Sequence, residues 1–541
     1  MMSYRISNFL DKALYFTLLL FLVSAFVLSI HAFFNPDMHF FQLETNYMIF
    51  ALILLLLFLS GLFIISKKTD EDKKTINKTD EELSQTNLND SVQVMENIRI
   101  KDVVFVFMSA FFLRLCFVFF FGYFVYPYSD FLWAHLRGLN LLNPNLYELW
   151  SGWAIFSIIL RIIYVTIPHY ITAQFVNIIV TSITAVIIYV LALKILSKRN
   201  IALAAAVIFA FYPPNILYNT ILTPEHIALL LTCIGILFLL MKRQSFLKQC
   251  VFCVLAGILC AFSDSLKAMA LIMIIAYIIT SILACFTNRA VLPLEANKDI
   301  GLGKLLSKLF ILFAILTATY SVTLFAVERT AEHILGIEFT SPANRRASVF
   351  FIGLQPSGEG QVHLGNNPRL YLTLVEETGG DFDLAREMMY DFLWQDIREN
   401  PGEFALLFPR KFRWAWQDDV FPAYHVWLTT HRHAETLPQI TEYISVELMY
   451  ISENVLSTVS QIFYIALVGL SIVGVFGAFR RNFNYGFFYI SLYLFGFFLL
   501  LLIAEAQSRY KIMIIPFLCI MAAYGFNLLL CKAQNFKYRK I

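Results

Sequence analysis

The sequence predicts an all-α polytopic membrane protein, with about 12 transmembrane helices, a re-entrant or interfacial first outer loop and a small α-rich extracellular domain. Of its 541 residues, 59% are hydrophobic and 15% are charged, whereas an ordinary soluble domain has roughly 25% charged residues. Apolar runs of about 18 residues or more, which are long enough to cross a bilayer, recur along the whole chain. These unbroken runs exclude a soluble enzyme and disfavour a β-barrel, whose strands alternate between apolar and polar residues.

Twelve apolar stretches are expected to span the membrane. They are residues 13–34, 47–66, 103–126, 170–194, 200–217, 224–241, 249–265, 267–287, 305–327, 456–479, 483–503 and 509–531. A thirteenth stretch, residues 151–167, contains Arg161 and ends at Pro168. It is short and interrupted, so we expect a re-entrant or interfacial segment there.

Basic residues predict the orientation of the chain. They follow the second, fourth, sixth and tenth predicted spans and end the chain: Lys67, Lys68, Lys194, Lys198, Arg199, Lys242, Arg243, Lys248, Arg480, Arg481, Lys532, Lys537, Arg539 and Lys540. The positive-inside rule places these positions, and therefore both termini, in the cytoplasm. We expect a multi-pass protein of the cell (cytoplasmic) membrane.

Two polar regions divide the chain into five predicted parts. In order, these are an N-terminal two-helix membrane extension (1–66), a cytoplasmic polar linker (67–102), a catalytic transmembrane core (103–327) with its first outer loop at 127–170, an extracellular domain (328–455), and C-terminal transmembrane helices with a basic cytoplasmic tail (456–541). The linker is rich in Lys, Asp, Glu, Asn and Thr, a composition typical of disorder. It therefore predicts that the first two helices form an appendage on a flexible tether.

The predicted extracellular domain differs from the linker because it can fold. It holds 19 acidic residues against 10 basic ones, a bias that favours the outer side. Its core is expected to use aromatic residues: Trp394, Trp414, Trp416, Phe404 and Phe408. Asp383 is expected to cap a helix that begins near Leu384 and stops before Pro401.

Ionisable residues close to the membrane are the best candidates for chemistry, because they are costly to place there. Asp130 lies just beyond the outer end of a long apolar helix, before an amphipathic stretch with His135 and Arg137. A carboxylate under a partly covered loop is well placed to act as a general base on an acceptor hydroxyl. The alternative is that Asp130 is an ordinary helix cap.

A second candidate group follows Tyr212-Pro213-Pro214, where one predicted span ends and the next begins with Pro224-Glu225-His226. This short turn puts Glu225 and His226 at the membrane depth expected for Asp130. The alternative is that Glu225 only complements the dipole at a helix N-terminus.

A third candidate group, Arg509, Tyr510 and Lys511, lies in a turn before the last predicted span. The planar Arg509 guanidinium matches a phosphate, and positive charge outside runs against the positive-inside trend. The alternative for Arg509 is an ion pair with Glu505. Lys267, in another outer turn with Asp264, either pairs with that carboxylate or lines a site.

The sequence gives little reason to expect a metal or cofactor. His425, His431 and His433 are not part of a compact ligand set, and Cys250 and Cys253 form a lone CxxC that is more often apolar packing. No cysteine lies in the large polar segments, so no disulfide framework is expected. We expect no metal, no cofactor and no nucleic-acid partner.

The order of these motifs over residues 103–531 resembles that of the C-type (GT-C) integral membrane glycosyltransferases, in the protein-mannosyltransferase and aminoarabinose-transferase-like branch. The matching features are Arg114 in the first core helix, Asp130, the Tyr212 motif, the Pro224-Glu225 pair and the Ser508-Arg509-Tyr510 turn. The segment from Gly353 to Gly360, with Pro401 and Lys411, looks like the external domain of Gram-positive members. The chain differs from many relatives in having Phe131 after Asp130, where they have Glu.

The resemblance implies transfer of a sugar from a polyprenyl-phosphate carrier to a hydroxyl at the outer face of the membrane, with inversion. It implies that Asp130 is the catalytic base, that Glu225 is a carboxylate of the pocket and that Arg509 holds the carrier phosphate. The partners would be a polyprenyl-phosphate-linked sugar donor, an envelope glycan, lipid or protein acceptor, and membrane lipid. The alternatives are a transporter or flippase, or a polymerase or ligase, of lipid-linked envelope saccharides.

Overall fold

The computed structural model describes residues 2–34, 45–80, 98–141, 151–241, 245–287, 301–358, 370–434, 438–480 and 484–538. Within these ranges the regular elements are helices, with no strand. The α-helices are α1 (Met2–Phe34), α2 (Thr45–Asp80), α4 (Ile100–Phe121), α5 (Asp130–Gly138), α6 (Ser151–Tyr164), α7 (Tyr170–Leu196), α8 (Arg199–Phe211), α9 (Pro213–Leu217), α10 (Glu225–Leu240), α11 (Phe246–Leu266), α12 (Ala270–Thr287), α13 (Leu302–Leu335), α14 (Pro342–Leu354), α15 (Leu370–Glu377), α16 (Phe382–Glu399), α17 (Pro401–Trp416), α18 (Phe421–Ala434), α19 (Gln439–Ile451), α20 (Ser457–Phe479), α21 (Tyr485–Ile503) and α22 (Ile515–Tyr538). Shorter helical segments are η3 (Tyr218–Thr220), η5 (Pro356–Gly358), the π-helical η6 (Ser452–Leu456) and η7 (Ser508–Met513).

Nine helices in the described ranges are long and apolar enough to cross a membrane: α1, α2, α4, α7, α11, α13, the continuous α19–α20, α21 and α22. A tenth arises if α8 and the segment Pro213–Thr220, which bend by 56° at their junction, form one span. The predicted spans 224–241 and 267–287 correspond to the shorter apolar helices α10 and α12. The all-α polytopic class is therefore confirmed, with nine or ten helices of spanning length against the twelve predicted.

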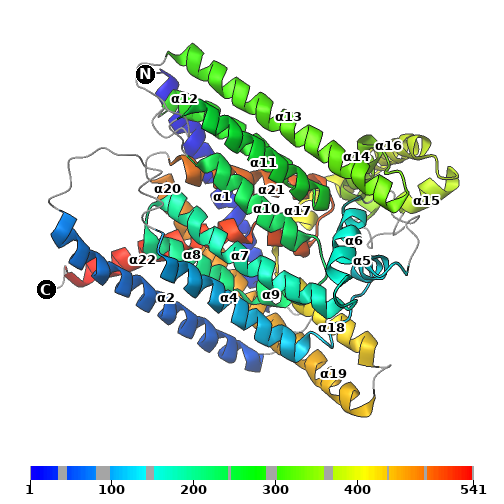
Figure 1. The fold of residues 1–541 in the computed structure, drawn as a ribbon, viewed down its shortest axis with the longest axis horizontal. Helices are drawn as coiled ribbons and strands as arrows, with labels where there is room; N and C mark the ends of the chain where they lie inside the picture. Colours follow the sequence, from blue (N-terminus) through cyan, green and yellow to red (C-terminus); the bar gives the residue numbers. More distant parts are fainter. Residues whose placement is uncertain are drawn as a thin grey trace.

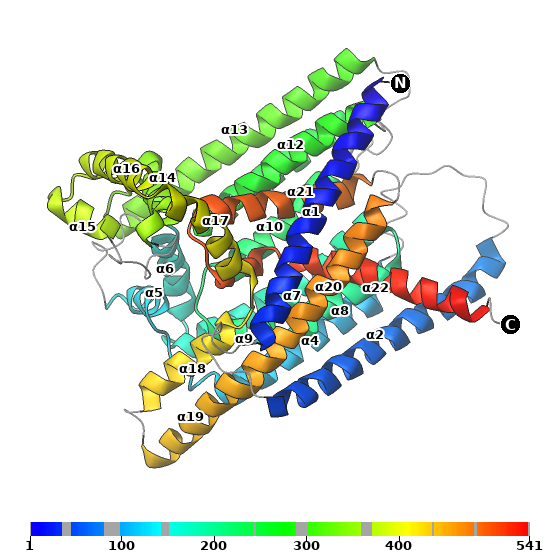
Figure 2. The same ribbon diagram turned by 180° about the vertical axis from the view of Figure 1, so that it is seen from behind.

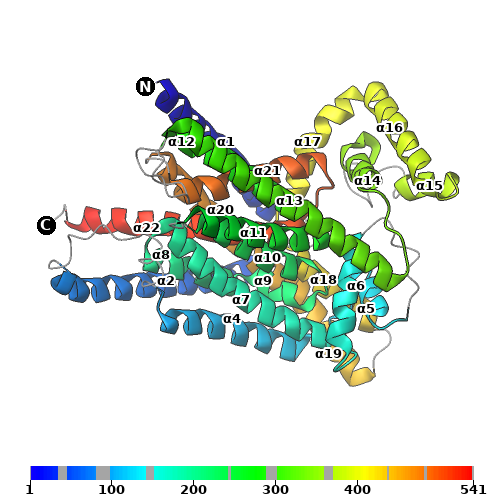
Figure 3. The same cartoon turned by 45° about the horizontal axis from the view of Figure 1, so that its top comes forward.

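The long helices form one bundle whose two ends differ (Figure 1). Both chain termini lie at one end, and α5, α6, α14–α16, α18 and α19 lie at the other. The view from behind shows the same division (Figure 2). Helix α6, which includes most of the thirteenth apolar stretch, runs across the direction of α4 and α7 at that second end (Figure 3).

The two N-terminal helices are packed into the bundle, which corrects the expectation of a tethered appendage. Helix α1 packs along α20 and also contacts α21 and α12. Tyr15, Leu18 and Leu22 on α1 are at most 1% exposed and belong to the main core. Residues 67–80 of the predicted linker continue α2, and residues 81–97 lie outside the described part of the chain.

The predicted extracellular segment is divided between two cores. Helices α14, α15 and α16 form a small lobe with its own core, which includes Phe351, Leu374 and Met389. Trp416 on α17 instead stacks on Phe498 of α21, with ring centroids 3.9 Å apart, in the main core. Trp394, expected inside the domain, is 56% exposed.

The helix predicted from Leu384 is α16, and its N-cap differs from the expectation. Asp381 is the capping residue, since its carboxylate accepts hydrogen bonds from the backbone N–H groups of Asp383 and Leu384. Asp383 lies two residues further along, in the first turn, and pairs with Arg386. The helix stops before Pro401 as predicted, because proline cannot continue the hydrogen-bond ladder of the preceding residues.

Candidate functional site

Asp130 and Arg509 face each other at the end of the bundle away from the termini. Asp130 is the first residue of α5, and its Oδ2 lies 3.8 Å from Nη1 of Arg509 in η7. The Asp130 side chain is 44% exposed and that of Arg509 is 14% exposed. The capping alternative does not hold for Asp130, because the N-cap position belongs to Ser129, whose φ of 53° lies in the left-handed region.

Glu225 and Lys267 form a second ion pair beside the first. Glu225 opens α10 and is 1% exposed, and its Oε1 lies 3.0 Å from the Lys267 ammonium, which follows α11. The Thr223 hydroxyl donates to the other Glu225 oxygen. Glu225 thus has specific partners in addition to the helix dipole. Asp264, the other partner considered for Lys267, instead accepts hydrogen bonds from Tyr320 and the Ala270 N–H.

Tyr510 connects the two pairs. The Lys267 ammonium lies 3.9 Å from the centroid of the Tyr510 ring, and the Arg509 guanidinium lies 5.2 Å from it. The electron-rich face of the ring favours both cations. The Tyr510 hydroxyl donates to Glu505 at 2.6 Å. Glu505, the alternative partner of Arg509, therefore bonds Tyr510, and the ion pair of Arg509 is with Asp130.

These contacts bring together five of the predicted site residues, which come from the N-termini of α5 and α10, the turn after α11, and η7: Asp130, Glu225, Lys267, Arg509 and Tyr510. We call them the carboxylate–cation cluster. Both cations contact the Tyr510 ring and each is paired with one carboxylate, so the cluster places a candidate base beside an anion-binding cation.

Tyr212 and Lys511 belong to a separate buried cluster. The Tyr212 hydroxyl donates to Asp419 at 2.6 Å, and the Lys511 ammonium donates to the carbonyl oxygens of Ala415 and Asp418. Lys511 also lies 4.0 Å from Asp419. These contacts hold the end of α17 against η7 and the start of α9, so both residues support the turn that carries Arg509.

His135, Arg137 and His226 are buried next to the site. His135 Nδ1 lies 2.8 Å from the Tyr164 hydroxyl of α6, and burial lowers the pKa of His135 to about 4, so this imidazole is neutral. The carbonyl of Arg137 accepts a hydrogen bond from Arg161 of α6. His226 Nε2 lies 2.9 Å from the Tyr218 carbonyl. These contacts hold α5 against α6 and hold η3 against α10, so they indicate that the three residues position the site.

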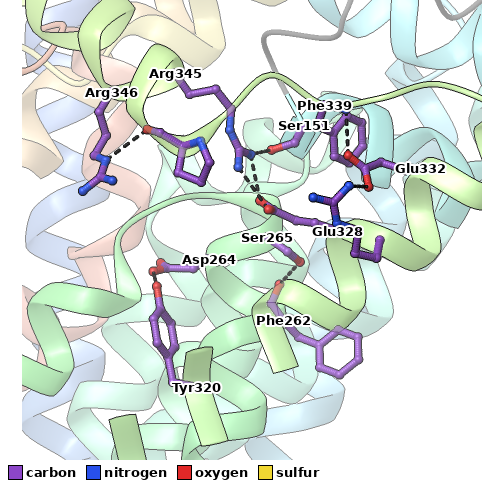
Figure 4. A network of polar contacts seen from close by, with 12 residues as sticks. Ser151, Phe262, Asp264, Ser265, Tyr320, Glu328, Glu332, Phe339, Arg345 and Arg346 are labelled. Carbon is purple, nitrogen blue, oxygen red and sulfur yellow. Dashed lines mark hydrogen bonds and ion pairs between the residues drawn. The ribbon is translucent and has the colours of Figure 1, made fainter. Parts of the chain in front are cut away.

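Polar contacts link α6, α13 and α14 near the end of α11 (Figure 4). Arg345 of α14 forms a two-pronged ion pair with Glu328 of α13, at 2.7 and 3.0 Å, and also bonds Ser151 of α6. Next to Ser151, a Cβ on Gly152 would lie 2.6 Å from the Leu266 carbonyl oxygen. Helix α6 therefore rests directly on the backbone just before Lys267.

Two aromatic residues near the cluster, Tyr218 and His425, were not predicted from the sequence to belong to the site. The Tyr218 side chain is 3% exposed, and its hydroxyl has no hydrogen-bond partner within the described ranges. It lies close enough to Glu225 and Arg509 to interact with their charges. His425 of α18, which was considered only as a metal ligand, packs its ring 4.8 Å from that of Phe131, and burial together with Arg509 lowers its pKa to about 3.

The cluster offers a base and cationic donors in one place. Asp130 is exposed enough to meet a substrate, and Arg509 Nε is buried without an acceptor in the described part of the protein. An oxygen-rich anion would satisfy that donor. No group of three or more His, Cys, Asp or Glu side chains within the described ranges is arranged to hold a metal ion. No family model matches the chain, and no curated protein matches it.

Proposed function

We propose that the protein is a membrane glycosyltransferase that moves a sugar from a polyprenyl-phosphate carrier to an acceptor hydroxyl, with inversion. The observation that carries the proposal is the 3.8 Å approach of Arg509 to Asp130, with the Arg509 Nε lacking an acceptor among the described residues. A base beside an anion-binding cation is the pair of groups that this reaction requires.

In the proposed step, the acceptor oxygen attacks the anomeric carbon of the donor sugar, and its proton passes to the Asp130 carboxylate. The bond between the anomeric carbon and the phosphate oxygen breaks, and the electron pair leaves with the carrier phosphate. Arg509 stabilises the charge that develops on that phosphate. The leaving group is already a good one, so the reaction needs a base for the acceptor and little acid catalysis.

Glu225 and Lys267 have a supporting role in this proposal. Their ion pair and the Tyr510 ring keep the Arg509 side chain from pairing with a second carboxylate. The buried Tyr218 hydroxyl is available for a substrate oxygen, since it has no partner in the described part of the chain. The acceptor would be an envelope glycan, lipid or protein that presents a hydroxyl.

The proposed orientation has twelve spans, both termini in the cytoplasm and the cluster on the extracellular side of the cell membrane. It is supported by the basic residues that cluster at the ends of alternate predicted spans and by the location of both termini at the end of the bundle opposite α5 and α14–α16. The count of twelve requires α8–α9, α10 and α12 to cross as short or bent helices.

Sugar transfer in membranes tests the proposal directly. Wild-type protein and Asp130→Asn would be expressed at matched levels and supplied with labelled undecaprenyl-phosphate sugars, with label in total envelope glycan as the readout. Transfer by the wild type and its loss in the variant would support the enzyme. Unchanged transfer in the variant would contradict the role of Asp130, and movement of the labelled lipid across the bilayer without transfer would indicate a flippase.

A further inference from the structure

Lys411 of α17 is a fully buried lysine behind the carboxylate–cation cluster. Its side chain is 0% exposed, and its ammonium donates to the Gly353 carbonyl oxygen of α14 at 2.5 Å. Burial lowers its pKa to about 7, against the opposing effect of Glu505. A lysine buried this deeply is costly to the fold unless a partner compensates the charge.

Gly353 brings Lys411 close to the loop that carries the site. A Cβ on Gly353 would lie 2.1 Å from the Ile503 carbonyl oxygen and 2.5 Å from the Ala504 carbonyl carbon. Only a glycine permits this approach of α14 to the end of α21, because any side chain would push the two backbones apart. Lys411 therefore contacts Gly353, and Gly353 contacts Ile503 and Ala504, which directly precede Glu505.

Glu505 links this stack to the cluster. Its carboxylate accepts a hydrogen bond from the Tyr510 hydroxyl at 2.6 Å and another from the Gln507 amide, and it lies close enough to Arg509 for their charges to interact. With Glu505 and Lys411 added to the cluster, the described residues give three carboxylates, Asp130, Glu225 and Glu505, and three cations, Lys267, Arg509 and Lys411. Without Lys411, the carboxylates outnumber the cations.

We infer that Lys411 is a positioning residue whose charge offsets Glu505 and leaves Arg509 available to the phosphate of the donor. The inference rests on the proposed function. Loss of the Lys411 charge leaves the Glu505 carboxylate uncompensated, so that its field acts on Arg509. The affinity for a phosphate therefore falls, while the base Asp130 stays in place. Because Lys411 is held by Gly353, the attachment of the α14–α16 lobe fixes the position of this charge.

The test measures binding of undecaprenyl phosphate to the purified full-length protein in detergent. Lys411→Gln is the main variant, because the amide retains a donor for the Gly353 carbonyl while removing the charge. We expect binding about tenfold weaker than wild type at pH 6, where Lys411 is protonated, and a smaller difference at pH 8.5, where the wild-type lysine has also lost its charge. In the Glu505→Gln background, the Lys411→Gln change is expected to have little further effect.

Two outcomes separate the inference from the proposed function. If the wild type does not bind undecaprenyl phosphate, the proposed function is contradicted. If the wild type binds it and Lys411→Gln binds equally well at pH 6, only the role of Lys411 is overturned. An equal loss in both Glu505 backgrounds would also overturn that role, since it would show that Lys411 acts independently of Glu505. The thermal unfolding midpoint of each variant establishes that it is folded.

Discussion

The Arg509 guanidinium lies 3.8 Å from the Asp130 carboxylate, although the two residues are 379 positions apart in the sequence. The distance is longer than a typical charge-assisted hydrogen bond, which has donor and acceptor about 2.7–2.9 Å apart. Asp130 is 44% exposed, so the pair contributes little to stability in this exposed setting. The two groups are near enough to contact one substrate together, and their ion pair is weak enough for a substrate to replace it.

The first prediction concerns Asp130→Asn. We expect sugar transfer to fall by about 100-fold, because the amide cannot accept the acceptor proton. The thermal unfolding midpoint should change little, since the side chain is exposed and its ion pair is long. Rates of label transfer in membranes and unfolding of the purified protein measure the two effects. Asp383→Asn is a matched control, because Asp383 is 73% exposed and also faces an arginine; a similar loss of transfer there would contradict the specific role of Asp130.

The second prediction concerns Arg509→Lys, which keeps the charge and removes the planar fork. We expect binding of undecaprenyl phosphate to weaken by about tenfold or more, because an ammonium cannot make the paired hydrogen bonds of a guanidinium. Titration of the detergent-solubilised protein with the lipid measures this loss. Arg410→Lys serves as the control, since Arg410 pairs with Glu403 on the surface of α17. Unchanged binding by Arg509→Lys would show that the phosphate is held elsewhere.

The sequence revealed the charged members of the cluster because they interrupt an apolar background. Asp130, Glu225 and Arg509 each lie where a predicted span begins or ends, and charged groups in such places are rare without a reason. The pairing of these residues was not predictable. It depends on which helix ends are neighbours, and apolar periodicity carries no information on that. The alternatives of a cap for Asp130 and of Glu505 as the partner of Arg509 therefore remained open until the packing was known.

Other features were missed for reasons that lie in membrane-protein packing. Apolar side chains face lipid and protein alike, so the composition of α1 does not indicate that Tyr15 and Leu18 pack against α20 and α21. The polar sequence after residue 66 suggested a tether, yet α2 continues to Asp80. Tyr218 is one of 26 tyrosines, and only the packing shows that its buried hydroxyl has no partner among the described residues.

The third prediction concerns the Glu225–Lys267 pair. The Glu225 side chain is 2% exposed and that of Lys267 is 20% exposed. We expect Glu225→Gln alone to destabilise the fold by up to about 3 kcal/mol, because it leaves Lys267 partly buried without its counter-charge. The double variant Glu225→Gln/Lys267→Met should recover part of that loss. Chemical unfolding in detergent, analysed as a double-mutant cycle, measures the coupling.

The control for this cycle is the exposed pair of Glu403 and Arg410, whose side chains are 51% and 38% exposed. Glu403→Gln is expected to change the free energy of unfolding by less than about 1 kcal/mol, as is usual for surface ion pairs. Equal effects at the two pairs, or a double variant less stable than both single variants, would argue against a compensated buried pair at Glu225.

The fourth prediction concerns the crossing of α20 and α22, the helix that follows η7. A Cβ on Gly474 would lie 2.1 Å from the Met521 carbonyl oxygen, and one on Gly525 would lie 2.1 Å from that of Leu470. Such close backbone contact through small residues is a common way for membrane helices to pack. Gly474→Ala must force the two helices apart, so we expect a loss of about 1–3 kcal/mol, as for other overpacked sites. Gly61→Ala in α2, where nothing lies within 4 Å of the added Cβ, is expected to leave stability unchanged or to raise it slightly. If Gly474→Ala were as stable as Gly61→Ala, the backbones of α20 and α22 would not be in close contact at Gly474.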